Sequence, residues 1–336
     1  MKIYFRNISY LLSLTPAFAV CAGNLLGESW SALNIIYSMG FLAALEWIIQ
    51  VNKNNNASEA TDSLPNLILL MHVLAQIACI ASFFYGIHTH ALQGVWIWVA
   101  AISMGINTGS AAIVVAHEYI HRKPTWQQFL GKFLLFTAGN FYFYIEHLRV
   151  HHKWVGTAKD TASAKQGESL YAFFLRSGLG QIKSAWQLES ERLKAKKQSM
   201  WSLNHYVIRQ IVLHILLDSA IIFWVGPTAL LAFVLHCLTA NFLLEYVNYI
   251  EHYGLSRKES ERVTEVHSWQ SDSPISRFLL IDLSRHADHH FYASKPYHTL
   301  SSYTTSPELP SGYAGMFFIA AIPPLWFKLI DKRIPQ

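Results

Sequence analysis

The chain has 336 residues, of which 52% are hydrophobic and only 14% are charged, and its formal net charge is +5. Soluble domains usually carry about 25% charged residues, so the composition argues against an ordinary soluble fold. The basic residues are scattered and no recognition motif accompanies them, which argues against nucleic-acid binding. Each of the three cysteines lies alone in an apolar block, so the sequence indicates neither a disulfide framework nor a thiolate metal site.

Apolar blocks long enough to cross a bilayer, which needs about 20 residues per helix, follow one another along the chain. The first is interpreted as a retained span rather than a cleaved signal peptide, because a second block begins almost immediately. The apolar segment 129–145 is shorter and is expected to be partly embedded. The predicted fold is all-α and integral to the membrane, with about six transmembrane helices at 9–26, 30–51, 64–87, 92–116, 207–225 and 227–250.

Lysine and arginine are distributed unevenly between the predicted spans. The segment 117–206 holds 13 of the 26, and the tail after residue 250 holds 9. Because basic loops stay on the cytoplasmic side, regions 117–206 and 251–336 are predicted to be cytoplasmic, together with both termini. A late apolar patch at 313–330 contains Pro323-Pro324, which favours an interfacial segment over a straight seventh span. The whole chain, 1–336, is predicted to form one membrane-embedded domain with a helical cytoplasmic cap.

Nine of the 17 histidines fall in four short clusters, each near the cytoplasmic end of a predicted span. Chance clustering explains this pattern poorly, and ionisable groups at a membrane edge are costly unless they are paired or functional. Nine nitrogen donors are too many for one metal ion and suit two. Imidazole admits iron, zinc, copper or nickel, so ligand type alone does not choose the metal. The candidate ligands are His117, His121, His147, His151, His152, His252, His286, His289 and His290.

Spacing within the clusters predicts which histidines share a helix face. Residues three or four apart are neighbours on a helix, so His117 is expected beside His121, and His147 beside His151. His286 is likewise expected beside both later histidines of its cluster. The second histidine of the adjacent pair at 151–152 then either reaches a second metal or completes the coordination of the first.

Isolated histidines near span ends are usually polar core residues or interfacial anchors. This reading applies to His72, His88, His90, His205, His214, His236 and His298. Polar residues in or near the clusters are instead expected to accept the outer N–H of a ligand imidazole and fix its tautomer. Direct metal binding by a carboxylate, a surface ion pair between Asp288 and Arg285, and a substrate-side role for His267 remain open. These candidates are Glu118, Glu146, Asp160, Glu251, His267 and Asp288.

Two other functions fit parts of the pattern. The pentapeptide at 117–121, HEYIH, is the signature of zinc metalloproteases, with two zinc ligands and a glutamate base on one helix. A protease of that kind leaves about six clustered histidines without a role. A metal transporter would place histidines through the membrane, whereas these gather at one edge.

At these clusters the sequence resembles the alkane 1-monooxygenase branch of the membrane fatty-acid desaturase and hydroxylase superfamily. Three clusters resemble the histidine boxes of that branch, and NYIEHYGL at 248–255 resembles its additional signature. The resemblance extends to 160–169, 267–269 and 309–313 and covers roughly residues 116–331. The first four spans match only in hydrophobic pattern.

The resemblance implies a non-haem di-iron site held by the nine histidines. It also implies O2-dependent hydroxylation, typically of a terminal methyl group, with electrons from rubredoxin or ferredoxin and its reductase. The location would be a bacterial-type inner membrane with the metal site on the cytoplasmic side. Departures such as Tyr119-Ile120 in the first box and Ser294-Lys295 after the last leave the ligands intact. They leave the substrate open between alkanes, xylene-type hydrocarbons, and fatty acids or other lipids, and they leave desaturation open.

Substrate and electrons must both reach such a site from outside the chain. A hydrophobic substrate is expected to enter from the bilayer into a cavity for which Trp96, Trp98 and Phe141 are candidate lining residues. Because no dinucleotide, flavin or CxxC motif is present, the chain is predicted to lack its own reductase. The basic stretch at 192–197 either steers an acidic electron carrier or reflects the topology bias alone.

Overall fold

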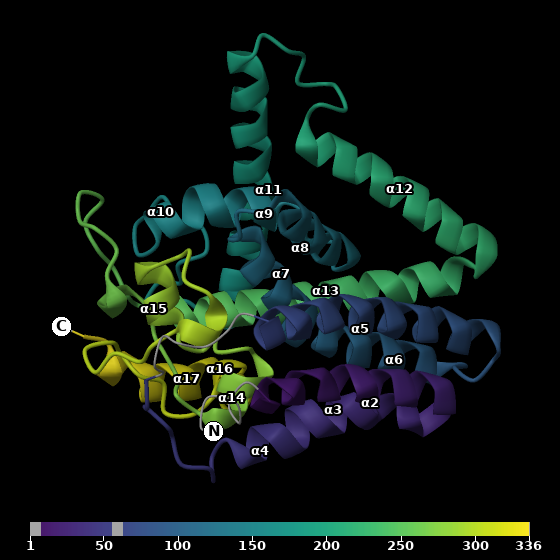
Figure 1. Cartoon of the computed structure of the whole chain (residues 1–336), viewed down its shortest axis with the longest axis horizontal. Helices are drawn as coiled ribbons and strands as arrows, with labels where there is room; N and C mark the ends of the chain where they lie inside the picture. Colours follow the sequence, from purple (N-terminus) through teal and green to yellow (C-terminus); the bar gives the residue numbers. More distant parts are fainter. Residues whose placement is uncertain (1–7, 56–62, 336) are drawn as a thin grey trace.

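The computed structural model describes residues 8–55 and 63–335, which contain helices and no β-strand (Figure 1). One isolated bridge joins Gln270 to Glu308. The predicted all-α fold is therefore confirmed. The helical elements are η1 (Tyr10–Leu14), α2 (Thr15–Leu26), η2 (Glu28–Ala32), α3 (Leu33–Ile35), η3 (Ile36–Leu42), α4 (Ala43–Leu45), α5 (Ser63–His88), α6 (Val95–Asn107), η4 (Thr108–Ala112), α7 (Ile113–Ile120), α8 (Thr125–Thr137), α9 (Phe143–Glu146), η5 (His147–His151), α10 (His152–Trp154), α11 (Leu170–Ala195), α12 (Tyr206–Trp224), α13 (Pro227–His252), η6 (Glu265–His267), α14 (Pro274–Leu279), α15 (His286–Phe291), η7 (Tyr297–Thr299), α16 (Tyr313–Ala320), α17 (Pro323–Ile330) and η8 (Asp331–Arg333).

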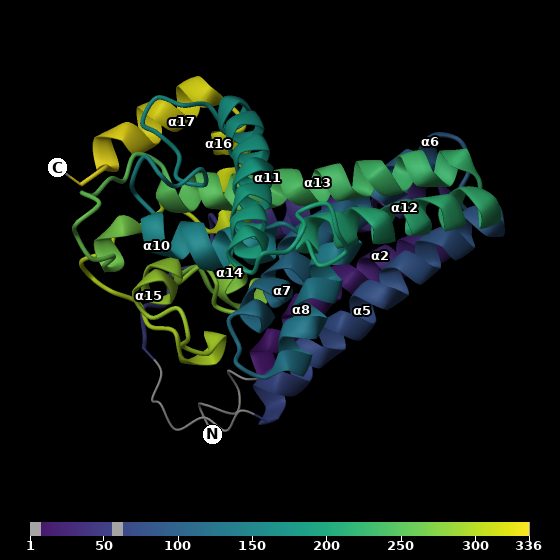
Figure 2. The ribbon, with the colours of Figure 1, turned by 90° about the horizontal axis from the view of Figure 1, so that it is seen from above.

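Among the described residues, four helices are long and apolar enough to cross a bilayer. They are α5, the continuous run of α6, η4 and α7, then α12 and α13. Tyr10–Leu26 forms a shorter apolar helix beside them. In both views α2, α5, α6 and α13 extend side by side, and α15, α16 and α17 gather at one end of the bundle (Figures 1 and 2). The chain is thus an all-α membrane protein with a folded cap at one end.

Two segments differ from simple spans. The second predicted span begins as short helical pieces over Glu28–Leu45, and the backbone has left the helix by Val51. The late apolar patch forms α16 and α17, and the helical path bends by 119° between them. Pro323 starts the second of these helices, and proline lacks the N–H that a continuous helix would need. The expectation that this patch would not form a straight span is confirmed.

Small residues let α6 and α13 approach each other closely. A Cβ atom built on Gly105 would lie 2.5 Å from Thr239 Cβ, and one on Gly109 would lie 2.8 Å from Leu243 Cβ. In a bilayer, helix association depends on such close van der Waals packing, since lipid is as apolar as a leucine side chain. This contact aligns the end of α13, which carries His252, with the end of α7, which carries His117.

The cap is attached to the bundle through buried polar groups. Arg285 Nε lies 3.0 Å from Asp272 Oδ1, and both side chains are fully buried. Arg285 also donates to the carbonyls of Leu300 and Asn54. Glu46, which follows α4, accepts from the Ser276 hydroxyl on α14 and from the Gly315 amide on α16. Segments far apart in sequence are therefore fixed around the start of α15.

Candidate metal centre

The nine clustered histidines converge at the cap end of the bundle and form two groups. The ends of α7 and α13, the turn η5 with α10, and helix α15 supply them. Each histidine of a group offers one ring nitrogen, and within each group these nitrogens all lie within 4.8 Å of one another, which is close enough to hold a metal ion. One group contains His117, His121, His147, His152 and His289, and the other contains His151, His252, His286 and His290.

The division between the groups differs from the spacing rule at one cluster. His117 and His121 share a group, as predicted, but His147 groups with His152 while His151 joins the other group. The reason is that His147–His151 is a π-helical turn, which brings residues five apart onto one face. The Nε2 atoms of His147 and His152 lie 2.9 Å apart. In α15, His286 groups with His290 alone, and His289 turns to the five-histidine group.

The geometry of the five-histidine group fits a metal ion. His121 Nε2 lies 3.0 Å from His147 Nε2 and 3.1 Å from His152 Nε2. Adjacent imidazole ligands at about 2.1 Å from one ion lie roughly 3 Å apart. Several buried ring nitrogens also have no hydrogen-bond partner in the part of the chain that the structure describes, which is costly unless something else binds them. They include His117 Nε2, His151 Nε2, His252 Nε2 and both nitrogens of His290.

Most of these imidazoles are held neutral, which is the state that binds metal. Burial, helped by the nearby His151, lowers the pKa of His121 to about 3. Burial also lowers the pKa of His289 and of His290. His151 is the exception: burial acts to lower its pKa, but the bonded Asp160 carboxylate, together with Glu146 and Glu245, raises the pKa.

Two predicted carboxylates contact ring nitrogens of the candidate ligands. Asp160 Oδ2 lies 3.0 Å from His151 Nδ1, and Asp160 is itself fixed by the Ser163 hydroxyl at 2.6 Å. Glu251 Oε2 lies 3.1 Å from His286 Nε2, and the Tyr313 hydroxyl donates to Glu251 Oε1 at 2.8 Å. Such partners orient the imidazole and set which nitrogen faces the metal.

Ser163 and Tyr313 did not emerge as candidates from the sequence. Neither residue lies in a histidine cluster, so cluster spacing carries no signal for them. Both lie in segments that resemble the alkane 1-monooxygenase branch, 160–169 and 309–313, and this resemblance was the one available indication.

The other polar candidates have different contacts. Glu118 accepts from Arg122 Nε at 2.9 Å and from the Tyr297 amide at 3.3 Å. Glu146 accepts from the Thr161 hydroxyl at 3.3 Å.

The side chains of Asp288 and His267 do not contact the ring nitrogens of the candidate ligands. Asp288 binds Lys295 Nζ and the Tyr303 hydroxyl, so the alternative of an ion pair with Arg285 is not what the structure shows. His267 contributes through its backbone, because its carbonyl lies 3.4 Å from His252 Nδ1.

The seven isolated histidines belong to neither group in the described part of the chain. His72 Nε2 lies 2.7 Å from the Ser13 hydroxyl, and His236 Nε2 lies 2.8 Å from the Thr108 hydroxyl. His214 contacts the carbonyls of Gln210 and Phe136. Polar pairing between helices explains the buried ones without a metal.

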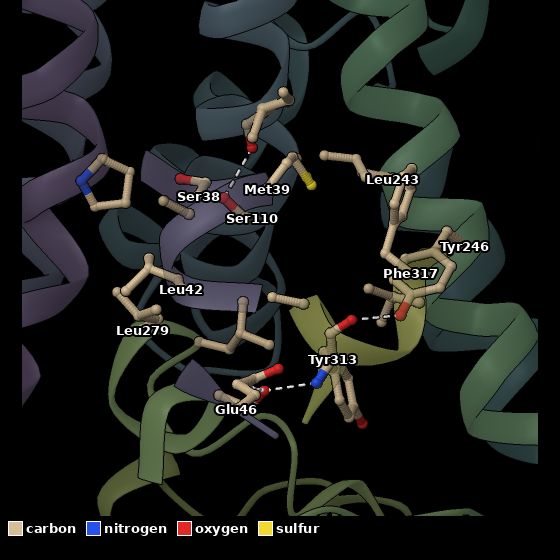
Figure 3. A pocket seen from close by; sticks show the side chains of 18 of the residues that line it. Ser38, Met39, Leu42, Glu46, Ser110, Leu243, Tyr246, Leu279, Tyr313 and Phe317 are labelled. Carbon is tan, nitrogen blue, oxygen red and sulfur yellow. Dashed lines mark hydrogen bonds between the residues drawn. The ribbon is translucent and has the colours of Figure 1, made fainter. Parts of the chain in front are cut away.

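An apolar cavity lies within the helical bundle, and Figure 3 shows side chains that line it. It is lined by side chains such as Met39, Leu42 and Phe317. Gly109 and Val247 line both this cavity and a smaller one bounded by His117, His147 and His286. The larger cavity is therefore separated from the smaller one, which borders the histidines, by a shared wall.

The aromatic residues suggested earlier for the cavity lie elsewhere. Trp98 packs in the core around Ala101 and Met104, and Phe141 packs against Tyr142 and His214. Trp96 is absent from the lining of both cavities. The aromatic side chains of these residues suggested a cavity wall, but the wall is built mainly from η3, η4, α13 and α16.

Two groups of buried imidazoles at the end of an apolar helical bundle define a metal-binding membrane protein. The fatty acid desaturase family profile matches residues 93–320. Alkane 1-monooxygenase 1 of Alcanivorax borkumensis is 32% identical over 347 residues, covering 100% of this chain and 85% of that relative. The alkane 1-monooxygenase of Acinetobacter baylyi is 33% identical over 350 residues, covering 97% and 84%.

The chain belongs to the fatty acid desaturase family and, within it, to the alkane hydroxylase branch. A more distant relative is the xylene/toluene monooxygenase hydroxylase component of Pseudomonas putida, 28% identical over 231 residues, which are 69% of this chain and 62% of the relative. The chain is accordingly an oxygen-dependent membrane oxidoreductase of the monooxygenase type.

Proposed function

We propose that this chain is a di-iron monooxygenase that hydroxylates the terminal carbon of an alkane. The reaction consumes O2, two electrons and two protons, and it yields the alcohol and water. The observation that carries the proposal is the convergence of nine imidazoles in groups of five and four beside an apolar cavity. Relatives named alkane 1-monooxygenase, matched over nearly the whole chain, support the same substrate class.

The nine histidines are the proposed iron ligands, with one ion in each group. Iron bound there would supply the O2 activation that an unactivated C–H bond requires, since no side chain is a strong enough oxidant. Asp160 and Glu251 orient His151 and His286. The His267 carbonyl contacts His252 Nδ1, and Glu118, Glu146 and Asp288 hold neighbouring groups in place through the contacts described above.

In this proposal the order of the two cavities, the larger first and the smaller beside the histidines, determines which part of the substrate reaches the metal site. A chain entering between Met39, Leu42 and Phe317 meets the histidines only at the inner end, past Gly109 and Val247. An unbranched hydrocarbon placed in this way presents its terminal carbon. The apolar walls also keep bulk water from the reacting carbon.

The electrons come from a separate protein in this proposal, a rubredoxin or ferredoxin with its reductase. The sequence contains no dinucleotide or flavin motif, and the donor is assigned to the side of the membrane that carries the cap. The distribution of lysine and arginine supports a cytoplasmic cap in a bacterial-type inner membrane. The domain assignment follows, with 117–206 and 251–336 on that side.

A xylene-type reaction is the second candidate, because the hydroxylase component of a xylene/toluene monooxygenase is among the relatives. Desaturation of a fatty acyl chain is a third outcome that the family name brings into consideration. The products separate all three: an alkanol, an aromatic alcohol or an alkene. The zinc metalloprotease suggested by HEYIH needs one further ligand and would leave about six histidines of the two groups unexplained.

The test uses purified full-length protein with a reductase and rubredoxin. Elemental analysis is expected to find about two irons per chain, and a panel of alkanes, xylenes and fatty acyl compounds is expected to give mainly 1-alkanols. Iron-free active protein would remove the di-iron assignment. An alkene product would remove the hydroxylase assignment but leave the metal site in place.

The cavity makes a separate prediction about chain length. Replacing Leu42 by alanine enlarges the cavity, so the enzyme is expected to prefer longer alkanes. The ratio of long-chain to short-chain product is expected to rise several-fold. Leu231→Ala is the control, because Leu231 is 59% exposed and lies outside the cavity lining. An unchanged product ratio in Leu42→Ala would show that substrate does not occupy this cavity.

A further inference from the structure

A basic cavity of about 540 Å3 lies where α11 ends and α12 begins. Its lining includes the side chains of Arg149, Arg192, Lys196 and Arg209, and Glu189 is the one carboxylate among the lining residues. Four cations against one anion leave a formal excess of three positive charges. These cations come from η5, from the last turn of α11 and the residue after it, and from the first turn of α12.

Only part of this charge is neutralised within the described chain. Glu189 accepts from Arg192 Nη2 at 2.8 Å, and Arg149 Nη1 is farther away at 3.7 Å. The structure shows no ion pair for Lys196 or Arg209 among the described residues, and the Arg209 guanidinium lies 5.6 Å from the centre of the Tyr206 ring. Arginine and lysine side chains disposed in this way are suited to bind phosphate oxygens.

Tyr206 adds a hydrogen-bond donor to the same cavity. Its side chain lines the cavity and is 7% exposed, and its hydroxyl has no hydrogen-bond partner among residues 8–55 and 63–335. A buried hydroxyl without a partner is costly, so a ligand oxygen that accepts from it is favoured.

A separate apolar groove lies mainly between α11 and α13, nearer the start of α11 than the basic cavity is. Phe174 and Leu179 on α11 and Phe233 and Leu238 on α13 line this groove, whose volume is about 400 Å3. The next residues along α12 after Arg209 that line a cavity are His214 and Asp218, which border the groove. A ligand spanning both sites must therefore be anionic at one end and apolar at the other.

The loop that joins α11 to α12 places this site at the membrane surface. It exposes Trp201 by 73% and Leu203 by 58%, next to an α12 that is long and apolar enough to cross a bilayer. Tryptophan is enriched where hydrocarbon meets the lipid headgroups. Figure 1 shows α11 projecting from the bundle and α12 returning obliquely, so that the loop lies at the tip of an arm.

We propose that the cavity between α11 and α12 is a binding site for an anionic phospholipid. The phosphate contacts Lys196, Arg209 and the Tyr206 hydroxyl, and the acyl chains lie along α12 and in the apolar groove. Basic pockets between membrane helices bind anionic headgroups in this way. A soluble acidic electron carrier would use the charge but not the adjoining groove, so the lipid explains both features.

The experiment measures lipid retention by the purified full-length protein in a neutral detergent, using native mass spectrometry. Phosphatidylglycerol and phosphatidylcholine with identical acyl chains are the probes, and phosphatidylglycerol is expected to bind at least about tenfold more tightly. The double variant Lys196→Gln/Arg209→Gln is expected to lose this preference, since each basic residue near a lipid headgroup contributes about fivefold. The control is Lys194→Gln/Lys197→Gln, which removes the same charge from exposed residues outside the cavity.

Further arms separate the lipid from other ligands. Inorganic phosphate at millimolar concentration is expected not to displace phosphatidylglycerol, because it cannot use the groove. Equal binding of the two lipids, or equal losses in both double variants, would overturn the proposal. So would a rise in KM for rubredoxin in the cavity variant with lipid retention unchanged, which would assign the charge to carrier docking. If the double variant does not fold, Arg209→Gln alone serves, because Arg209 is exposed.

Discussion

The histidine groups and the α11–α12 arm are built in opposite ways. The histidine end buries polar groups: seven of the nine candidate ligands are buried, and His121 and His152 are partly buried. The α11–α12 arm exposes apolar groups instead, with Phe223 83% exposed and Leu216 62% exposed on α12. Buried polarity marks where the chain binds a metal, and exposed apolarity marks where it meets lipid.

The largest effect is expected from single alanine replacements in the two histidine groups. His252→Ala leaves three imidazoles in its group and His289→Ala leaves four, so His252→Ala should lose more iron, falling to about one ion per chain. Hydroxylation should fall below detection in both variants. Elemental analysis and product formation are the measurements.

His214→Ala provides the matched control for these variants. His214 is part-buried and bonds to two backbone carbonyls, and it belongs to neither histidine group. The iron content of the His214→Ala variant should remain at about two ions per chain. Full activity in both His252→Ala and His289→Ala would contradict the assignment of nine ligands.

The histidine clusters were predictable from sequence, but their division into groups was not. Nine histidines at helical spacings indicate metal binding whichever residues share an ion. The spacing rule assumes 3.6 residues per turn, and the π-helical turn at His147–His151 breaks that assumption. A π-turn is stabilised by the surrounding packing, for which the local sequence carries no clear signal.

The positions of the membrane helices could be predicted from hydropathy, but whether each helix faces lipid or protein could not. α12 and the span that begins with α6 have the same mean hydropathy of 1.7, yet 11% of the apolar stretch of α12 is buried and 83% of that of the other span is buried. A helix that is apolar on all sides is compatible with lipid or with protein as its neighbour. The same ambiguity is why the sequence allowed Trp98 and Phe141 either to line a cavity or to pack in the core, and in the structure Trp98 packs against the core and Phe141 against Tyr142 and His214.

A second large effect should come from the buried ion pair that fixes the cap. Arg285→Leu leaves Asp272 charged, buried and unpaired, so the cap should lose about 3–5 kcal/mol of stability. Thermal unfolding followed by circular dichroism would report the loss. Asp272→Asn/Arg285→Leu removes both charges and should recover part of the stability, and no recovery would show that the backbone contacts of Arg285 dominate.

A smaller effect is expected at Asp160, which touches a ligand rather than the metal. Asp160→Asn keeps the shape but removes the negative charge beside His151 Nδ1, so iron affinity or turnover should fall about 10–100-fold. Asp160→Glu retains the charge and should keep more activity. Iron titration with a competing chelator separates lost affinity from lost turnover, and wild-type values for Asp160→Asn would remove Asp160 from the site.

The smallest effect should occur on the arm, where the apolar surface faces lipid. Leu216→Ala exchanges one lipid-facing apolar side chain for another, so the free energy of unfolding should change by less than about 0.5 kcal/mol. Leu243→Ala on α13, where the side chain is 6% exposed, should cost about 2–5 kcal/mol because it leaves a cavity. Thermal unfolding in the same detergent compares the two. If Leu216→Ala were as costly as Leu243→Ala, α12 would pack against protein in solution, and a second copy of the chain would replace lipid as its neighbour.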